Sequence, residues 1–189
     1  MRIEFMAPDQ HQRRNDVRVD IQDGIHARAC TGGNIALVES DPYQFSGKLP
    51  DGTAASIHLR VTRPHALVML KCLAMDDRYR NLRGPAHAGR DRDDVSVHVA
   101  DIIAIASAQS NLPRFQSDFD GQFRLEPAVG ARVRGIVQEY FGSDIAPGFL
   151  LYEEFLTANR PMGGADDRET VASDLRRAHS VAQVLLPLQ

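Results

Sequence analysis

The hydrophobic pattern of this 189-residue chain changes its period near Pro64. Before that residue, apolar and polar residues alternate in short runs, which is typical of half-buried strands. After it, apolar residues recur at helical spacing in longer segments. Proline suits the first turn of a helix, with Thr62 or Arg63 near its cap. The order of strands and then helices predicts an α+β fold, with a small mixed sheet lobe over residues 1–62 and a helical lobe over 63–189, which could share one core.

The predicted sheet is small, and its first strand begins almost at the first residue. Alternation and turn residues predict, in chain order, strands over residues 2–8 and 17–22, a loop over 23–34, a short helix or strand over 35–39, and a hairpin with strands near 43–47 and 55–61. A Pro-Asp-Gly turn at Pro50–Gly52 closes the hairpin. We expect the first strand to form an open edge, which a partner subunit could complete.

Helical spacing accounts for most of the remaining chain. It predicts helices over residues 64–80, 91–108, 127–141, 149–159 and 169–186. Segments rich in glycine and proline separate them.

Composition narrows the class of protein. A net charge of -3 and a pI near 6.1 argue against non-specific nucleic-acid binding by the whole surface. Cys30 and Cys72 lack the short spacing of a zinc knuckle or a disulfide framework, so we expect a reducing, cytoplasmic environment. The N-terminus lacks the apolar core of a signal peptide, and no apolar run reaches membrane-spanning length, so we expect no membrane association.

Lys71 is an unusual residue, because Lys48 and Lys71 are the lysines among 22 lysine and arginine residues. On the predicted helix, Lys71 lies beside an apolar stripe and in register with Arg78, seven residues later. Two cations in register repel each other unless an anion lies near them, and a ligand that carries phosphate would supply one. The alternative is a lysine whose stem covers apolar surface while its amine reaches water, and periodicity alone favours that reading.

The second predicted helix carries an acidic line with one histidine. Asp91, Asp94, His98 and Asp101 fall within an arc of about 80° next to an apolar stripe. Such a line could hold a metal ion or orient a cation such as Lys71 or an arginine. It could also be a solvated face, with Asp91 as a favourable charge near the helix N-terminus. Spacing alone favours the solvated face.

Asp20 is a lone carboxylate in the strand over 17–22, on the face opposite Val19 and Ile21. It is either an exposed strand residue or a carboxylate on the face of the sheet that carries a functional site.

In order and spacing, these segments resemble nucleotidyltransferase-like proteins of the AbiEii toxin type. In that family a strand ends in a proline, and a helix follows with a K-x-x-A pattern and a downstream arginine, which here are Pro64, Lys71, Ala74 and Arg78. A second helix opens with K-D-x-x-D, which here reads Arg90, Asp91, Arg92, Asp93, Asp94, with arginine in place of lysine. The resemblance covers about residues 15 to 108.

The resemblance implies a DNA-polymerase-β-like core that binds a nucleoside triphosphate and Mg²⁺ between the sheet and helical lobes. Such a core transfers a nucleotide to an acceptor such as RNA or a protein side chain. By carry-over, Lys71, Asp91 and Asp20 would be catalytic, with Asp20 as a metal ligand. Nucleotide binding would involve Lys71, Arg78 and Asp94.

The chain departs from the family in one element, a Gly-Ser turn followed by Asp-x-Asp ahead of the strand with Asp20. We therefore expect weak or no transfer activity, either because the chain is a degenerate relative or because the true start lies upstream. The alternative is a catalytically inactive remnant that acts as an interaction module for an antitoxin protein or RNA. A homo-oligomer formed through the open sheet edge is a third reading.

Overall fold

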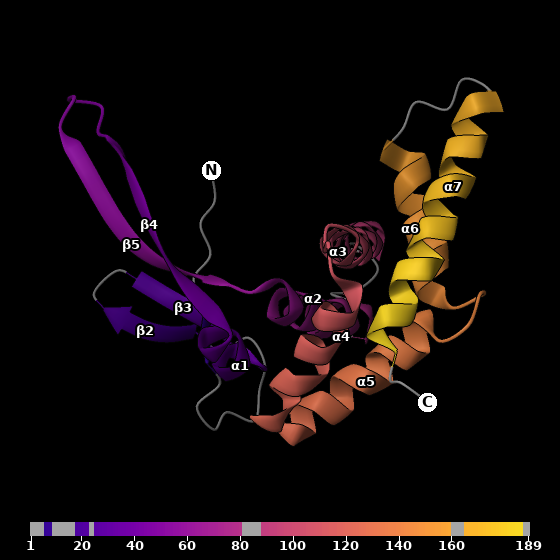
Figure 1. Ribbon diagram of the computed structural model, residues 1–189, viewed down its shortest axis with the longest axis horizontal. Coiled ribbons are helices and arrows are strands. Elements are labelled where there is room, and N and C mark those ends of the chain that lie inside the picture. Colours follow the sequence, from indigo (N-terminus) through magenta and orange to yellow (C-terminus); the bar gives the residue numbers. More distant parts are fainter. Residues whose placement is uncertain (1–5, 9–17, 23–24, 81–87, 160–164, 187–189) are drawn as a thin grey trace.

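The computed structural model describes residues 6–8, 18–22, 25–80, 88–159 and 165–186. Figure 1 shows the strands on one side of the molecule, and α6 (Pro147–Asn159) and α7 (Ala165–Ala182) lie farthest from them. The predicted mixed α+β class is confirmed. No helix in the described ranges is both long enough and apolar enough to cross a membrane.

The first sheet has three strands in the order β1–β3–β2. These are β1 (Met6–Pro8), β2 (Arg18–Gln22) and β3 (Ile25–Cys30), with β3 parallel to β1 and antiparallel to β2. The prediction of a loop over 23–34 was therefore wrong for residues 25–30, which form the central strand. That segment reads Ile-His-Ala-Arg-Ala-Cys and carries little strand signal, but hydrogen bonding along both of its edges stabilises it. β1 is an edge strand, and the rest of the predicted strand over 2–8 lies outside the described residues.

The predicted hairpin is confirmed and is longer than expected. It consists of β4 (Ser40–Lys48) and β5 (Ala54–Thr62), paired in antiparallel register over their whole length. At the turn, the Gly52 N–H donates to the Leu49 carbonyl at 2.8 Å, and Gly52 has a φ of 86°, which favours glycine. Figure 1 shows this hairpin projecting away from the helices as an arm.

A short helix, α1 (Gly33–Val38), links the first sheet to the hairpin and contacts the first long helix. Its N-cap, Gly32, has a φ of 79°, and a Cβ there would lie 3.0 Å from the Met69 methyl and 3.2 Å from a Leu73 methyl. Glycine therefore allows both the left-handed backbone and the close approach to the next helix, α2 (Pro64–Arg80).

The predicted helices are confirmed, with ends shifted by a few residues. Besides α2, α6 and α7 they are α3 (Ala88–Ser107) and α5 (Pro127–Phe141). One further helix, α4 (Leu112–Gly121), was not predicted. Its N-cap is Asn111, whose side chain accepts a hydrogen bond from the Arg114 N–H at 3.0 Å. Short 3₁₀ turns follow α4 and α7, at Gln122–Arg124 and Gln183–Leu185.

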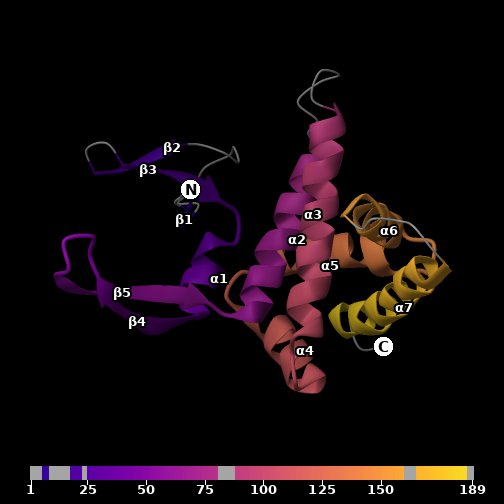
Figure 2. The ribbon, with the colours of Figure 1, turned by 90° about the horizontal axis from the view of Figure 1, so that it is seen from above.

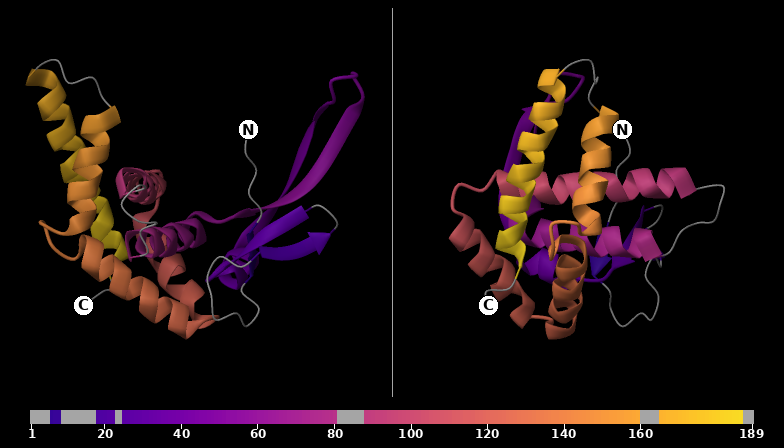
Figure 3. Two further views of the ribbon diagram at one scale, coloured as in Figure 1. Left: turned by 180° about the vertical axis from the view of Figure 1, so that it is seen from behind. Right: turned by 90° about the vertical axis from the view of Figure 1, so that its right-hand side faces the viewer.

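Among the residues whose burial the structure describes, the core lies among the helices. Figure 2 shows α2 and α3 side by side, and Figure 3 shows α6 and α7 packed together beyond α3. The largest fully buried side chains include Tyr140, Phe119, Phe141, Met69 and Met75. Cys72 is a free thiol, and burial raises its pKa to about 12. Cys72 therefore behaves as a small apolar core residue.

Candidate functional site

The candidate site is built on the packed pair of helices α2 and α3. Val68 and Met75 of α2 and Val99 of α3 are fully buried, so the apolar stripes of both helices contribute to the shared core. This packing fixes the polar residues that flank each stripe.

A ladder of two ion pairs runs along one edge of this contact. The Lys71 Nζ lies 2.6 Å from the Asp101 Oδ2, and the Arg78 Nε lies 3.8 Å from the Asp94 Oδ2. The pairs are one heptad apart on each helix and run in opposite directions, so the helices are antiparallel. We call these four residues the charge ladder.

The charge ladder agrees with one of the readings of the acidic line. Asp101 and Asp94 orient Lys71 and an arginine, as one alternative predicted. The carboxylates of α3 also supply the anions that two cations in register require. The side chains of both cations are 29% exposed, so each is partly reachable from solvent.

His98 lies between the two carboxylates on the same face of α3, four residues after Asp94 and three before Asp101. Its Nδ1 is buried, with no hydrogen-bond partner among the described residues. Burial lowers the pKa of His98, and the positive charge of Lys71 lowers it further. The charge ladder therefore surrounds a neutral imidazole whose buried nitrogen is unsatisfied, which is costly in a folded protein.

The charge ladder lies on the edge of α2 that points away from α5. Asp76 faces α5, because it accepts a hydrogen bond from Arg132 at 3.2 Å. At 100° per residue, Lys71 and Arg78 are about 140° and 160° away from Asp76 around the helix. The two cations are therefore not covered by α5.

A second polar cluster lies on the side of α2 that faces α5, and the sequence alone did not reveal it. Asp76 is 4% exposed and also accepts from Arg80 at 2.5 Å, while Arg132 bonds Asp77 as well. Burial raises the pKa of the neighbouring Tyr140, whose hydroxyl has no hydrogen-bond partner in the described part of the chain. The contacts of Arg132 join residues more than 50 positions apart, so they attach α5 to α2 and have no local signal.

Two predicted site residues lie in the expected elements, but their side chains are outside the described part of the structure. Asp20 is in β2, opposite His26 of β3. Asp91 is in the first turns of α3, ahead of Asp94. Their predicted roles stay predictions.

The described side chains do not fit a Mg²⁺ ion. Asp94 and Asp101 are separated by a helical rise of about 10 Å, whereas ligands of one Mg²⁺ lie about 2.1 Å from it. Each is also paired with a cation. No three histidine, cysteine, aspartate or glutamate residues in the described ranges are grouped so as to hold a metal.

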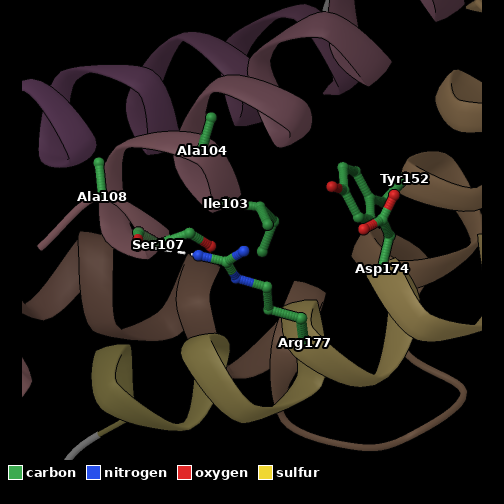
Figure 4. A pocket seen from close by; sticks show the side chains of 7 residues that line it. All are labelled: Ile103, Ala104, Ser107, Ala108, Tyr152, Asp174 and Arg177. Atoms are coloured by element: carbon green, nitrogen blue, oxygen red, sulfur yellow. Dashed lines mark hydrogen bonds between the residues drawn. The ribbon is translucent and has the colours of Figure 1, made fainter. Parts of the chain in front are cut away.

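A pocket of about 330 Å³ lies elsewhere, among α3, α6 and α7. Figure 4 shows Arg177 of α7 reaching toward the end of α3, where it donates to the Ser107 carbonyl at 3.4 Å. Ile103 and Ala104 contribute apolar lining, and Tyr152 and Asp174 contribute polar groups. The predicted site residues do not line this pocket.

Comparisons with protein-family models, with curated proteins and with solved structures find no match to this chain.

Proposed function

We propose that this chain is a nucleotide-binding module of the nucleotidyltransferase type, with Lys71 and Arg78 as contacts for the phosphates of a nucleoside triphosphate. The proposal assigns weak or no nucleotide transfer to the chain. The observation that carries it is the charge ladder, in which two partly exposed cations share one edge of α2 with an unsatisfied histidine nitrogen beside them.

The charge ladder supports phosphate binding, because a phosphate group could replace a carboxylate as the anion beside Lys71 or Arg78. A triphosphate carries several charges on closely spaced oxygens, so it can contact both cations at once, whereas each carboxylate pairs with one cation. The Arg78 Nε lies 3.8 Å from the Asp94 Oδ2, which is longer than a hydrogen bond, and the planar fork of a guanidinium suits the geometry of a phosphate. The Lys71 ammonium has three donors, so it can keep Asp101 while it contacts a phosphate.

His98 adds a polar group at the same place. Its neutral imidazole can donate through one nitrogen and accept through the other, depending on the tautomer. The order of the proline, Lys71 and Arg78 in the sequence, which resembles that of AbiEii-type proteins, is the reason to name a nucleotide rather than another anion.

The proposal of weak or no transfer rests on the carboxylates that the structure describes. A nucleotidyltransferase of this type uses Mg²⁺ to neutralise charge on the leaving phosphates. Because the described carboxylates do not fit that ion, we assign them no catalytic step. The phosphates are bound by the side chains of α2.

Isothermal titration calorimetry with each of the four nucleoside triphosphates, with and without Mg²⁺, tests the proposal. We expect heat for at least one nucleotide without the metal. Lys71→Ala should weaken binding by roughly tenfold or more, which is the usual effect of one charged hydrogen bond. Lys48→Ala is the matched control, because Lys48 lies at the far end of β4 and should not affect binding.

Asp101→Asn separates a binding site from a purely structural ion pair. If Lys71 contacts phosphate, removal of the competing negative charge should tighten nucleotide binding. If the pair only stabilises the helix contact, the variant should lower stability and leave nucleotide heats at zero. An absence of heat for all four nucleotides contradicts the proposal and leaves the interaction-module reading.

A further inference from the structure

The arm formed by β4 and β5 has one apolar and one polar face. In its register Tyr43 is opposite Leu59 and Phe45 is opposite Ile57, and residues directly opposite each other share a face. The rings of Tyr43 and Phe45 lie 6.4 Å apart along the strand. With Val61, these residues form what we call the apolar arm face.

The opposite face of the arm is polar. Gln44 lies opposite His58, and Ser46 lies opposite Ser56. The Gln44 side chain donates to the Ser56 hydroxyl at 2.9 Å, across the ribbon. This division follows the two-residue period of the strands, with hydrophobic residues confined to one side.

The apolar arm face is exposed in the single chain. Its five side chains are 42% to 55% exposed, and the arm projects away from the helices (Figure 1). A two-stranded ribbon with an uncovered apolar side is marginal in water. Contiguous exposed apolar surface of this kind marks an interaction site in a soluble domain.

We propose that the apolar arm face packs against the same face of a second copy of this chain, so that the protein is a dimer joined through its arms. The face carries no charged side chain between Asp41 and Arg63 at its base and the turn at its tip, so two copies meet without like-charge repulsion. A two-fold axis places apolar side chains of one copy against those of the other.

The area of the face is sufficient for such a contact. An aromatic side chain buries about 150–250 Å² when fully covered and an aliphatic one less, so five half-exposed ones offer up to roughly 500 Å² per copy. Two copies then bury roughly 1,000 Å², which is about the lower limit for a specific interface. The tip residue Leu49, which is 50% exposed, adds to this area.

The proposal differs from pairing through an open sheet edge. Pro42 in β4 has no N–H, and prolines in sheets occur where the N–H would face away from the ladder. The outer edge of β4 therefore lacks one of the donors that an added strand would use. Packing through the apolar arm face needs no backbone N–H donors. The effect of a substitution on such a contact depends on which side of the ribbon the residue occupies.

Sedimentation velocity or light scattering on the full chain tests the proposal with a matched pair of variants. We expect the wild-type protein to have twice the 20.9 kDa mass of one chain at micromolar concentration. Phe45→Lys places a charge in the contact and should weaken dimerisation by roughly 100-fold. Ser46→Lys, the next residue, places the same charge on the polar face and should leave the dimer intact.

A second pair on the other strand repeats the comparison. Ile57→Lys should dissociate the dimer, and His58→Lys should not. A monomeric wild-type protein overturns the proposal, as does a dimer that survives Phe45→Lys. If the variants on the polar face weaken the dimer as much as those on the apolar arm face, the proposal is also overturned, and pairing through the edge is indicated. Far-ultraviolet circular dichroism of each variant shows that the chain is folded.

Discussion

Gly130→Ala should destabilise the protein, because α5 approaches the preceding 3₁₀ turn at this residue. A Cβ on Gly130 would lie 2.5 Å from the Phe123 Cβ and 2.8 Å from its Cγ. Carbon atoms in contact are ordinarily about 3.5–4.0 Å apart. The Phe123 Cβ is attached to the backbone, so the clash cannot be relieved by a rotation of the ring. The turn itself has to move.

The expected net cost is about 1–2 kcal/mol. Overpacking of this kind costs about 1–3 kcal/mol, and the better helix propensity of alanine returns up to about 1 kcal/mol. A shift of the turn also disturbs the edge-to-face contact of Phe123 with Phe119, whose ring centroids are 5.2 Å apart. We therefore expect a value near the upper end of that range.

Gly135→Ala is the matched control on the same helix. Gly135 is exposed, and a Cβ there would meet nothing within 4 Å. This substitution should stabilise the protein by about 0.5–1 kcal/mol. Urea unfolding followed by circular dichroism measures both variants, and their midpoints should move in opposite directions. A midpoint for Gly130→Ala at or above that of the wild type would refute the packing of α5 described here.

Two further predictions concern buried polar groups. Arg132→Ala should lower the free energy of unfolding by about 1–2 kcal/mol, because it leaves the buried Asp76 carboxylate with Arg80 as its one described cationic partner. The control is Arg114→Ala, which removes a surface pair with Asp118. In the same urea titration it should cost less than about 0.5 kcal/mol. Equal losses would contradict the central role given to the Asp76 cluster. Since the pKa of His98 lies below its ordinary value of 6.5 in the folded state, the unfolded chain binds more protons below that pH, and stability should fall as the pH drops from about 6.5. His98→Asn should flatten that part of the stability profile, and an unchanged slope would show that another group causes it.

Much of the fold could be predicted from local patterns. The change of period at Pro64, the Pro-Asp-Gly turn and the helical stripes gave the hairpin and most helices. β3 was missed because its residues carry little strand propensity and its stability comes from neighbours on both sides. α4 was missed because Asn111 and Pro113, which start it, also resemble a turn signal.

The candidate site was predictable only where one helix carries the signal. The register of Lys71 with Arg78, and the spacing of Asp94 and Asp101, placed four residues that the structure brings together. The Asp76–Arg132 contact joins two helices across 56 positions and cannot be read from either one. The nucleotide, Mg²⁺ and an antitoxin or RNA partner came from the resemblance, and they stay predictions.

The most direct test of the nucleotide-binding proposal uses the fact that Lys48 and Lys71 are the lysines of this chain. Acetylation with limiting reagent, followed by mass spectrometry, gives the reaction rate of each amine with and without a millimolar nucleoside triphosphate. The proposal predicts that at least one nucleotide slows acetylation of Lys71 severalfold and leaves the rate at Lys48 unchanged. Equal rates at Lys71 with and without every nucleotide would contradict it.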